Sequence, residues 1–166
     1  MNEIQERRML RLAAYLRTIG RGKFDMRQWF SLPKRQDYDK EYSSFGAKLF
    51  LDECGTKACA MGHACIAMPT LFRKKRYTRD LLYIGPNPAP LPELDNTPDG
   101  FEAAVQGFGI TEEESNCLFG SAGVWRGTDG QTTAMKKATP KQVARQIELF
   151  VNDKEQWAEE NGYEYD

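Results

Sequence analysis

The chain has 166 residues, of which 40% are hydrophobic and 28% are charged, and its net charge is −1 at neutral pH. This composition excludes a disordered protein, and no apolar run approaches the ~20 residues that a membrane-spanning helix needs. The N-terminus lacks the apolar region of a signal peptide, so we expect a cytoplasmic protein that folds as one domain over residues 1–166, with a frayed acidic end at 159–166.

The first predicted element is an amphipathic helix over residues 3–19, with an apolar stripe at helical spacing and a glycine at its end. A second, short helix is expected to start at Asp25 as N-cap and to stop before Pro33. The apolar residues of this second stretch are predicted to lie in the core or in a lid over it: Phe24, Met26, Trp29 and Phe30.

The stretch from Cys54 to Met68 holds three of the four cysteines and the single histidine, and it carries no charge after Lys57. A helix over residues 57–68 is predicted here, with Thr56 as N-cap and Pro69 preventing its continuation. Because a helix that is apolar on all sides is usually buried, we expect this one to form the centre of the fold.

Two segments, 45–51 and 77–84, have patterns that do not decide between a short strand and other structures. The proline-rich residues 85–92 predict an extended connection. A helix is expected to begin near Thr97-Pro98 and to end around residues 107–109.

The C-terminal third contains two capping boxes, Thr111 with Glu114 and Thr139 with Gln142, and each predicts a helix. The last helix is expected to reach about Glu160, and residues 121–138 are predicted to form a long loop. The predicted fold class is therefore mainly α, a single compact domain of five or six helices around the buried helix 57–68, with room for one small β-hairpin.

A binding site for an anion is predicted at the start of the central helix. Gly55, Thr56 and Lys57 would bring a hydroxyl, an ammonium and free backbone N–H groups to one helix N-terminus. N-capping alone also explains Thr56, and no phosphate-loop or dinucleotide-binding motif is present. The basic N-terminal half strengthens the prediction, because residues 1–83 carry 17 Lys and Arg against 9 Asp and Glu. Other candidate ligand-binding residues are Arg73, Arg76 and Arg126 for charge, and Trp29 and Trp125 for stacking on a base.

Metal and thiol chemistry are two alternatives for the same stretch. Cys54, Cys59, His63 and Cys65 offer enough ligand types for zinc, but Cys65 points away from the helix face that Cys59 and His63 share. A closed site would therefore need Cys54 to fold back and Cys117 to come from another helix. Cys59 near a helix N-terminus, with His63 one turn further on as a base, is also compatible with a thiol enzyme. Buried structural cysteines and a core histidine explain the same residues without chemistry, so no catalytic residue, metal or cofactor is assigned.

The order of these motifs resembles a family of small proteins from tailed bacteriophages and some bacteria that carries no assigned activity. The resemblance rests on three segments: Phe24-x-Met26-x-x-Trp29, Cys54-Gly55-Thr56-x-Ala58-Cys59-x-x-Gly62-x-Ala64, and Leu118-Phe119 ahead of the Thr-Pro-capped last helix. It implies an accessory protein that acts in the cytoplasm of the host bacterium, where such proteins often counteract defence.

These observations favour a phage host-interaction or anti-defence protein that captures an anionic, nucleotide-like ligand. An inhibitor that binds a host protein through residues 121–138 is the first alternative, and a thiol or zinc enzyme is the second. No membrane partner is expected. Nucleic acid is not favoured, because a duplex-binding protein is usually basic overall.

Overall fold

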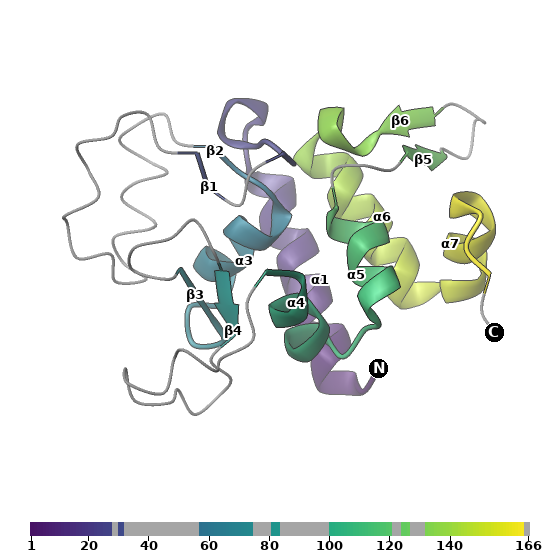
Figure 1. The fold of residues 1–166 in the computed structure, drawn as a ribbon, viewed down its shortest axis with the longest axis horizontal. Helices are drawn as coiled ribbons and strands as arrows, with labels where there is room; N and C mark the ends of the chain where they lie inside the picture. The colour runs from purple at the N-terminus through teal and green to yellow at the C-terminus, as the bar shows by residue number, and fades with distance from the viewer. Residues whose placement is uncertain are drawn as a thin grey trace.

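The computed structural model describes residues 1–27, 30–31, 57–74, 81–83, 100–120, 124–126 and 132–164. These residues form a mainly helical fold, as predicted (Figure 1). The α-helices are α1 (Glu3–Thr18), α3 (Ala60–Ala67), α4 (Gly100–Phe108), α5 (Glu112–Phe119), α6 (Pro140–Asn152) and α7 (Lys154–Asn161). Two 3-10 turns, η1 (Arg21–Lys23) and η4 (Met135–Lys137), complete the helical elements of the described residues.

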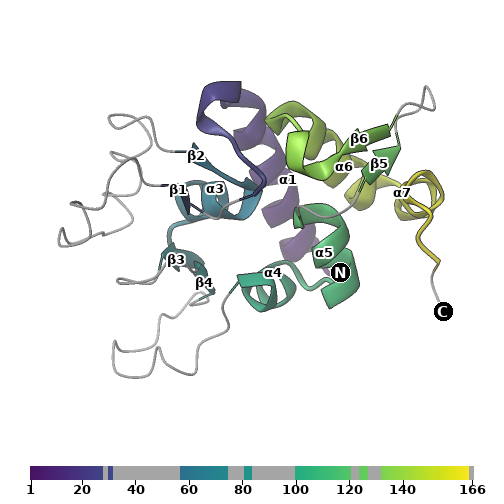
Figure 2. The same ribbon diagram turned by 45° about the horizontal axis from the view of Figure 1, so that its top comes forward.

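Helix α1 lies in the middle of the molecule. Asn2 caps it, and the side chain of Gln5 completes a capping box that the sequence analysis did not identify. Its predicted apolar stripe is fully buried except for Ile19, which follows the helix and is partly buried. The stripe packs against α3, α4 and α6, with α3 on one side and α6 on the other in Figures 1 and 2. The buried residues of this stripe are Met9, Leu12, Ala13 and Leu16.

Helix α3 is buried, as predicted, but it is shorter than the predicted helix 57–68. It begins at Ala60 with Cys59 as N-cap, so the prediction that Thr56 caps it is wrong. Lys57–Ala58 forms strand β2, which pairs antiparallel with strand β1 (Phe30–Ser31), and the backbone N–H of Asp25 donates to the carbonyl of Ala58 at 3.0 Å. This long-range pairing holds residues 57–58 extended and delays the helix until Ala60.

The described residues contain three small antiparallel sheets, more β-structure than the single hairpin expected. Strand β3 (Phe72–Lys74) pairs with β4 (Leu81–Tyr83), which confirms a strand in part of the undecided segment 77–84. Strand β5 (Val124–Arg126) pairs with β6 (Thr132–Ala134), so the prediction of a long loop over 121–138 is wrong. Val124, Trp125 and the threonines at 132 and 133 favour a strand, and their pairing outweighs the glycine-rich composition around them.

The prediction of a short helix after Asp25 is also wrong, because the described residues of this stretch form a turn and a strand. The Asp25 carboxylate accepts the backbone N–H of Arg27 at 3.0 Å, which makes a turn, and Phe30 follows in strand β1. Phe24 and Met26 are buried, as predicted. Trp29 and the segment 45–51 lie outside the described residues, as do Thr97 and Pro98.

The C-terminal helices follow the predicted capping chemistry closely. Thr111 and Thr139 each form a capping box with the residue three positions later, Glu114 and Gln142. The last helix, however, is two helices, because Asp153 ends α6 and caps α7 by accepting the backbone N–H of Gln156 at 2.9 Å.

Part of the acidic end that was expected to fray, from residue 159 onward, belongs to helix α7. Helix α7 continues to Asn161 and ends at Gly162, whose φ of 64° is the left-handed conformation that glycine adopts most readily. The ring of Tyr163 then packs against Trp157, with ring centroids 5.4 Å apart. The helix cap and this ring contact join residues 162–163 to the rest of α7.

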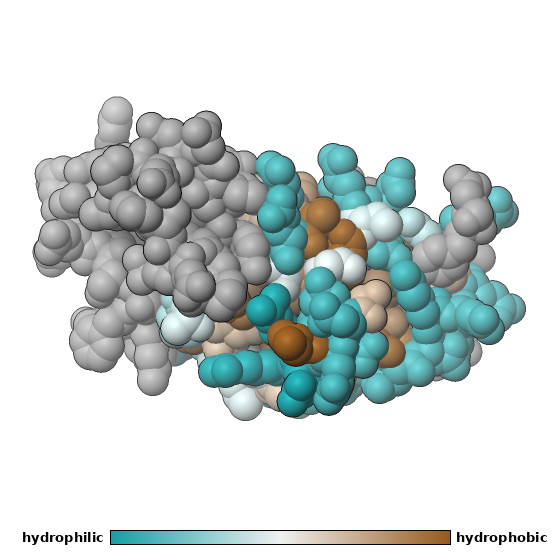
Figure 3. Space-filling model, turned by 90° about the horizontal axis from the view of Figure 1, so that it is seen from below, coloured by the Kyte–Doolittle hydropathy of each residue, from teal (hydrophilic) through white to brown (hydrophobic). Residues whose placement is uncertain are grey.

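On the face shown in Figure 3, the described residues are mostly hydrophilic, and the hydrophobic ones among them appear as separate spots. Among the described residues, the exposed large hydrophobic side chains are Met1, Ile4 and Val124. No helix in the described ranges has the length and apolar character needed to cross a bilayer.

Candidate anion-binding site

Among the sequence-predicted ligand residues, the structure describes the side chain of Trp125 only. Thr56, Trp29 and Arg76 lie outside the described residues. Lys57, Arg73 and Arg126 belong to strands β2, β3 and β5, where only their backbone is described.

Trp125 is not a surface stacking platform. Its side chain is only 2% exposed, and its indole N–H donates to the carbonyl oxygen of Cys117 at 2.8 Å. Strand β5 places this ring in the core, where it fixes the hairpin against α5. The predicted stacking role of Trp125 is therefore wrong.

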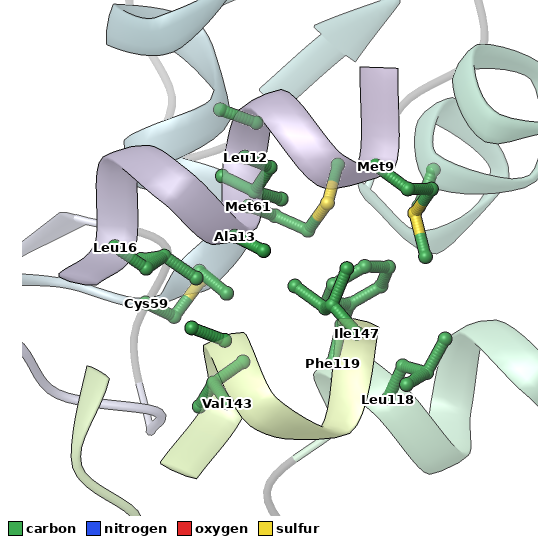
Figure 4. Packing of buried hydrophobic residues seen from close by; sticks show 14 of the residues in the cluster. Met9, Leu12, Ala13, Leu16, Cys59, Met61, Leu118, Phe119, Val143 and Ile147 are labelled. Atoms are coloured by element: carbon green, nitrogen blue, oxygen red, sulfur yellow. The ribbon is translucent and has the colours of Figure 1, made fainter. Parts of the chain in front are cut away.

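The first turn of α3 is not open to solvent. Cys59, Ala60 and Met61 are each at most 1% exposed, and Gly62 and His63 are buried behind them. Figure 4 shows Cys59 and Met61 within the apolar cluster that also contains Leu16. An anion therefore has no access to the backbone N–H groups of this helix end.

Burial also removes the basis for thiol catalysis by Cys59. Desolvation raises the pKa of the Cys59 thiol to about 11, and the backbone N–H groups of Gly62 and Met61 only partly oppose this rise. Desolvation also lowers the pKa of His63 to about 4, although the carbonyl of Lys23 favours its protonated form. Both shifts make the pair poorly suited to act as nucleophile and base at neutral pH, so the structure gives no support to the thiol-enzyme alternative.

The zinc alternative receives no support from the described residues. They contain no group of three or more histidine, cysteine, aspartate or glutamate side chains placed to hold a metal ion. Cys54, one of the four proposed ligands, lies outside them.

A different site lies between the turns η1 and η4. The structure has a hollow of about 480 Å³ there, and Figures 1 and 2 show the two turns next to each other beyond the end of α1. One wall comes from the residues after α1 and the other from those before α6. The lining residues are Arg21, Gly22, Phe24, Asp25, Arg27, Lys136, Lys137 and Ala138.

The hollow is strongly basic. Four of its lining residues are cationic and one is acidic. The carboxylate of Asp25 binds Arg27 through two hydrogen bonds of 2.8 and 2.6 Å. Arg21, Lys136 and Lys137 are exposed, and the described part of the chain holds no ion pair for any of them. Three cations that have no ion pair with any described residue thus line one concave surface.

The lining of the hollow also includes two apolar residues that belong to the core. Phe24 and Ala138 are buried, and the ring of Phe24 stacks on the imidazole of His63 with centroids 5.9 Å apart and planes at 14°. His63 Nε2 lies 3.1 Å from the carbonyl oxygen of Lys23, which ties η1 to the buried helix α3. The wall that carries Arg21 is therefore fixed to the core from below.

The hollow could not be predicted from the sequence, because its two walls are more than 100 residues apart in the chain. The available signals were an Arg-Gly-Lys run after a helix and a Lys-Lys pair before a Thr-Pro cap, and neither signal alone specifies a site. The pairing of α1 with α6 brings them together.

Comparison of the chain with protein-family models, with curated proteins and with solved structures finds no match. What the hollow binds is therefore inferred from its own residues.

Proposed function

We propose that the protein is a binding protein that captures an anionic, phosphate-bearing small molecule in the hollow between η1 and η4. The observation that carries the proposal is the meeting of Arg21, Lys136 and Lys137, three cations without ion-pair partners in the described part of the chain. The ligand is the same class that the sequence suggests, but the site is a different one.

Electrostatics supports an anion at this place. Like charges that face one concave surface repel each other. An anion between them is attracted to each cation, and this attraction offsets the repulsion. Phe24 and Ala138 add two buried apolar side chains to the lining beside these cations. Arginine adds a planar fork of donors that fits phosphate oxygens, and lysine adds a point charge.

The volume also fits a small molecule. Pockets for small ligands are usually about 300–1,000 Å³, and the hollow of about 480 Å³ lies within that range.

We further propose a biological setting from the resemblance to small phage proteins. In that setting the protein acts in the cytoplasm of the host bacterium and removes a phosphate-bearing molecule that host defence uses. The resemblance and the ligand class both support this setting.

Calorimetry with sodium tripolyphosphate tests the binding proposal. We expect saturable binding that weakens as the salt concentration rises, because the contacts are between charges. A Lys136→Ala/Lys137→Ala double variant should bind about tenfold more weakly or worse, which corresponds to about 1.4 kcal/mol. Lys141→Ala is the matched control, because Lys141 is an exposed lysine of α6 that does not line the hollow.

Two results would count against the proposal. One is the absence of binding at low salt, and the other is equal affinity of the double variant and wild type. If Lys141→Ala weakens binding as much as the double variant does, the attraction comes from overall charge and not from the hollow.

A further inference from the structure

We infer that the hollow recognises the phosphate chain of an oligophosphate and does not read any base or sugar attached to it. This inference rests on the proposed function and makes it more specific. It concerns free oligophosphates and nucleoside polyphosphates alike, because both present the same chain.

The charge of the hollow favours a chain of phosphates over a single phosphate group. Four cationic residues and one carboxylate line it, which leaves a net charge of +3. A phosphate monoester carries about −1.5 to −2 at neutral pH, so it neutralises only part of this charge, and longer phosphate chains carry more. A ligand with several linked phosphates matches the site better.

The placement of the cations points the same way. Arg21 and Arg27 belong to the wall that follows α1, whereas Lys136 and Lys137 belong to turn η4 on the other wall. A single phosphate placed against one wall leaves the cations of the other wall unpaired. An extended chain brings phosphate oxygens to both walls at once.

The lining offers little that could read a base. It contains no Ser, Thr, Asn, Gln, Tyr or Trp among the described residues, and these side chains usually supply hydrogen bonds or stacking surfaces for a base. Both carboxylate oxygens of Asp25 already accept hydrogen bonds from Arg27. Phe24 is 6% exposed, and its ring is packed against His63, so it presents little surface for stacking.

A series of ligands tests this inference by calorimetry in metal-free buffer with EDTA. The probes are tripolyphosphate, ATP, GTP, AMP and a ten-residue oligothymidylate. We expect tripolyphosphate, ATP and GTP to bind within about threefold of one another, and AMP to bind at least about tenfold more weakly. The oligothymidylate should bind more weakly than tripolyphosphate, because each of its phosphodiesters carries one charge and its bases find no partner.

An Asp25→Asn variant provides a second, independent test. Its amide oxygen can still accept the backbone N–H of Arg27, while the net charge of the hollow rises by one. We expect tripolyphosphate to bind several-fold more tightly to this variant than to the wild type. The affinity for AMP should rise by a smaller factor.

The outcomes separate the two proposals. If none of the probes binds, the proposed function fails and this inference fails with it. If tripolyphosphate binds but AMP binds equally well, or if ATP and GTP differ by about tenfold, the proposed function survives and this inference is overturned. ATP that binds about tenfold more tightly than tripolyphosphate would identify a nucleoside-reading site. An oligothymidylate that binds more tightly than tripolyphosphate would identify a single-strand-binding surface.

Discussion

Nε2 of His63 lies 3.1 Å from the carbonyl oxygen of Lys23, and this contact joins the buried helix α3 to the wall of the basic hollow. Because a carbonyl only accepts, Nε2 must carry the proton. Nδ1 is buried without a hydrogen-bond partner in the described part of the chain, so the neutral Nε2–H tautomer fits this site.

This histidine predicts a specific dependence of stability on pH. Burial lowers its pKa to about 4 in the folded protein, against an ordinary value of 6.5. Between these values the unfolded chain takes up a proton that the folded chain does not. Stability should therefore fall as the pH drops from 6.5 to 4, by about 3 kcal/mol in total.

Urea unfolding between pH 4 and 7 tests this prediction against His63→Gln, which keeps an amide donor for Lys23 and does not titrate. Glu148, whose pKa is lowered by its hydrogen bond with Arg17, is common to both proteins and cancels in the comparison. An equal pH slope in the two proteins would contradict the prediction. So would an NMR titration of this single histidine with a midpoint near 6.5.

A second prediction concerns Gly107, which lies against the ring of Phe72. A Cβ at this position would be 2.3 Å from Cζ of Phe72, and that ring is fully buried next to Phe108. Gly107→Ala should destabilise the protein by about 1–3 kcal/mol, despite the better helix propensity of alanine. Thermal unfolding measures the effect.

The control is Gly22→Ala, where a Cβ meets nothing within 4 Å and stability should not fall. Adding Phe72→Leu to Gly107→Ala should recover part of the loss. If Gly107→Ala is as stable as wild type, the close packing of α4 on β3 is refuted.

A third prediction concerns the ion pair that joins α5 to α7. Oε1 of Glu114 lies 2.5 Å from Nζ of Lys154, while Oε2 accepts the backbone N–H of Thr111 at 2.8 Å. The Glu114 side chain is 2% exposed, and in the described part of the chain Oε1 has no hydrogen-bond partner besides this ammonium. Lys154→Met should cost about 1–3 kcal/mol, because it leaves a buried carboxylate oxygen unpaired.

A double-mutant cycle with Glu114→Gln isolates the pair, since glutamine keeps an oxygen for the capping box. We expect the free energy of unfolding of the double variant to fall by less than the sum of the decreases in the two single variants. If the decreases in the free energy of unfolding, measured in urea, are additive, the ion pair contributes nothing to stability.

A fourth prediction is that Cys59 is chemically inert. It is 1% exposed and burial raises its pKa to about 11, so little thiolate forms at pH 8. Iodoacetamide should modify Cys59 in the native protein at least about a hundredfold more slowly than in urea, because the reaction requires opening of the core. Peptide mapping by mass spectrometry gives both rates, and a fast reaction in the native protein would restore the thiol-enzyme alternative.

Local signals predicted most of the helices. The capping boxes at Thr111 and Thr139 and the stripe of α1 act within one or two turns, so the sequence displays them directly. The break at Asp153 had the same kind of signal, an aspartate three residues before Gln156, and sequence reasoning could have found it.

Non-local pairing explains what was missed. Thr56 has the chemistry of an N-cap, but the pairing of residues 57–58 with residues 30–31 moved the start of the helix to Ala60. The hollow likewise needs α1 and α6 to pack before Arg21 approaches Lys136 and Lys137. No pattern within either segment encodes that approach.

The most direct test of the account places a negative charge inside the hollow without changing its packing. A Cβ at Gly22, which lines the hollow, meets nothing within 4 Å, and the same holds at Gly20, which does not line it. Gly22→Asp should weaken tripolyphosphate binding by about tenfold or more, whereas Gly20→Asp should weaken it by less than about threefold, with both variants as stable as wild type. Equal affinities for the two variants would contradict the claim that this hollow is the anion-binding site.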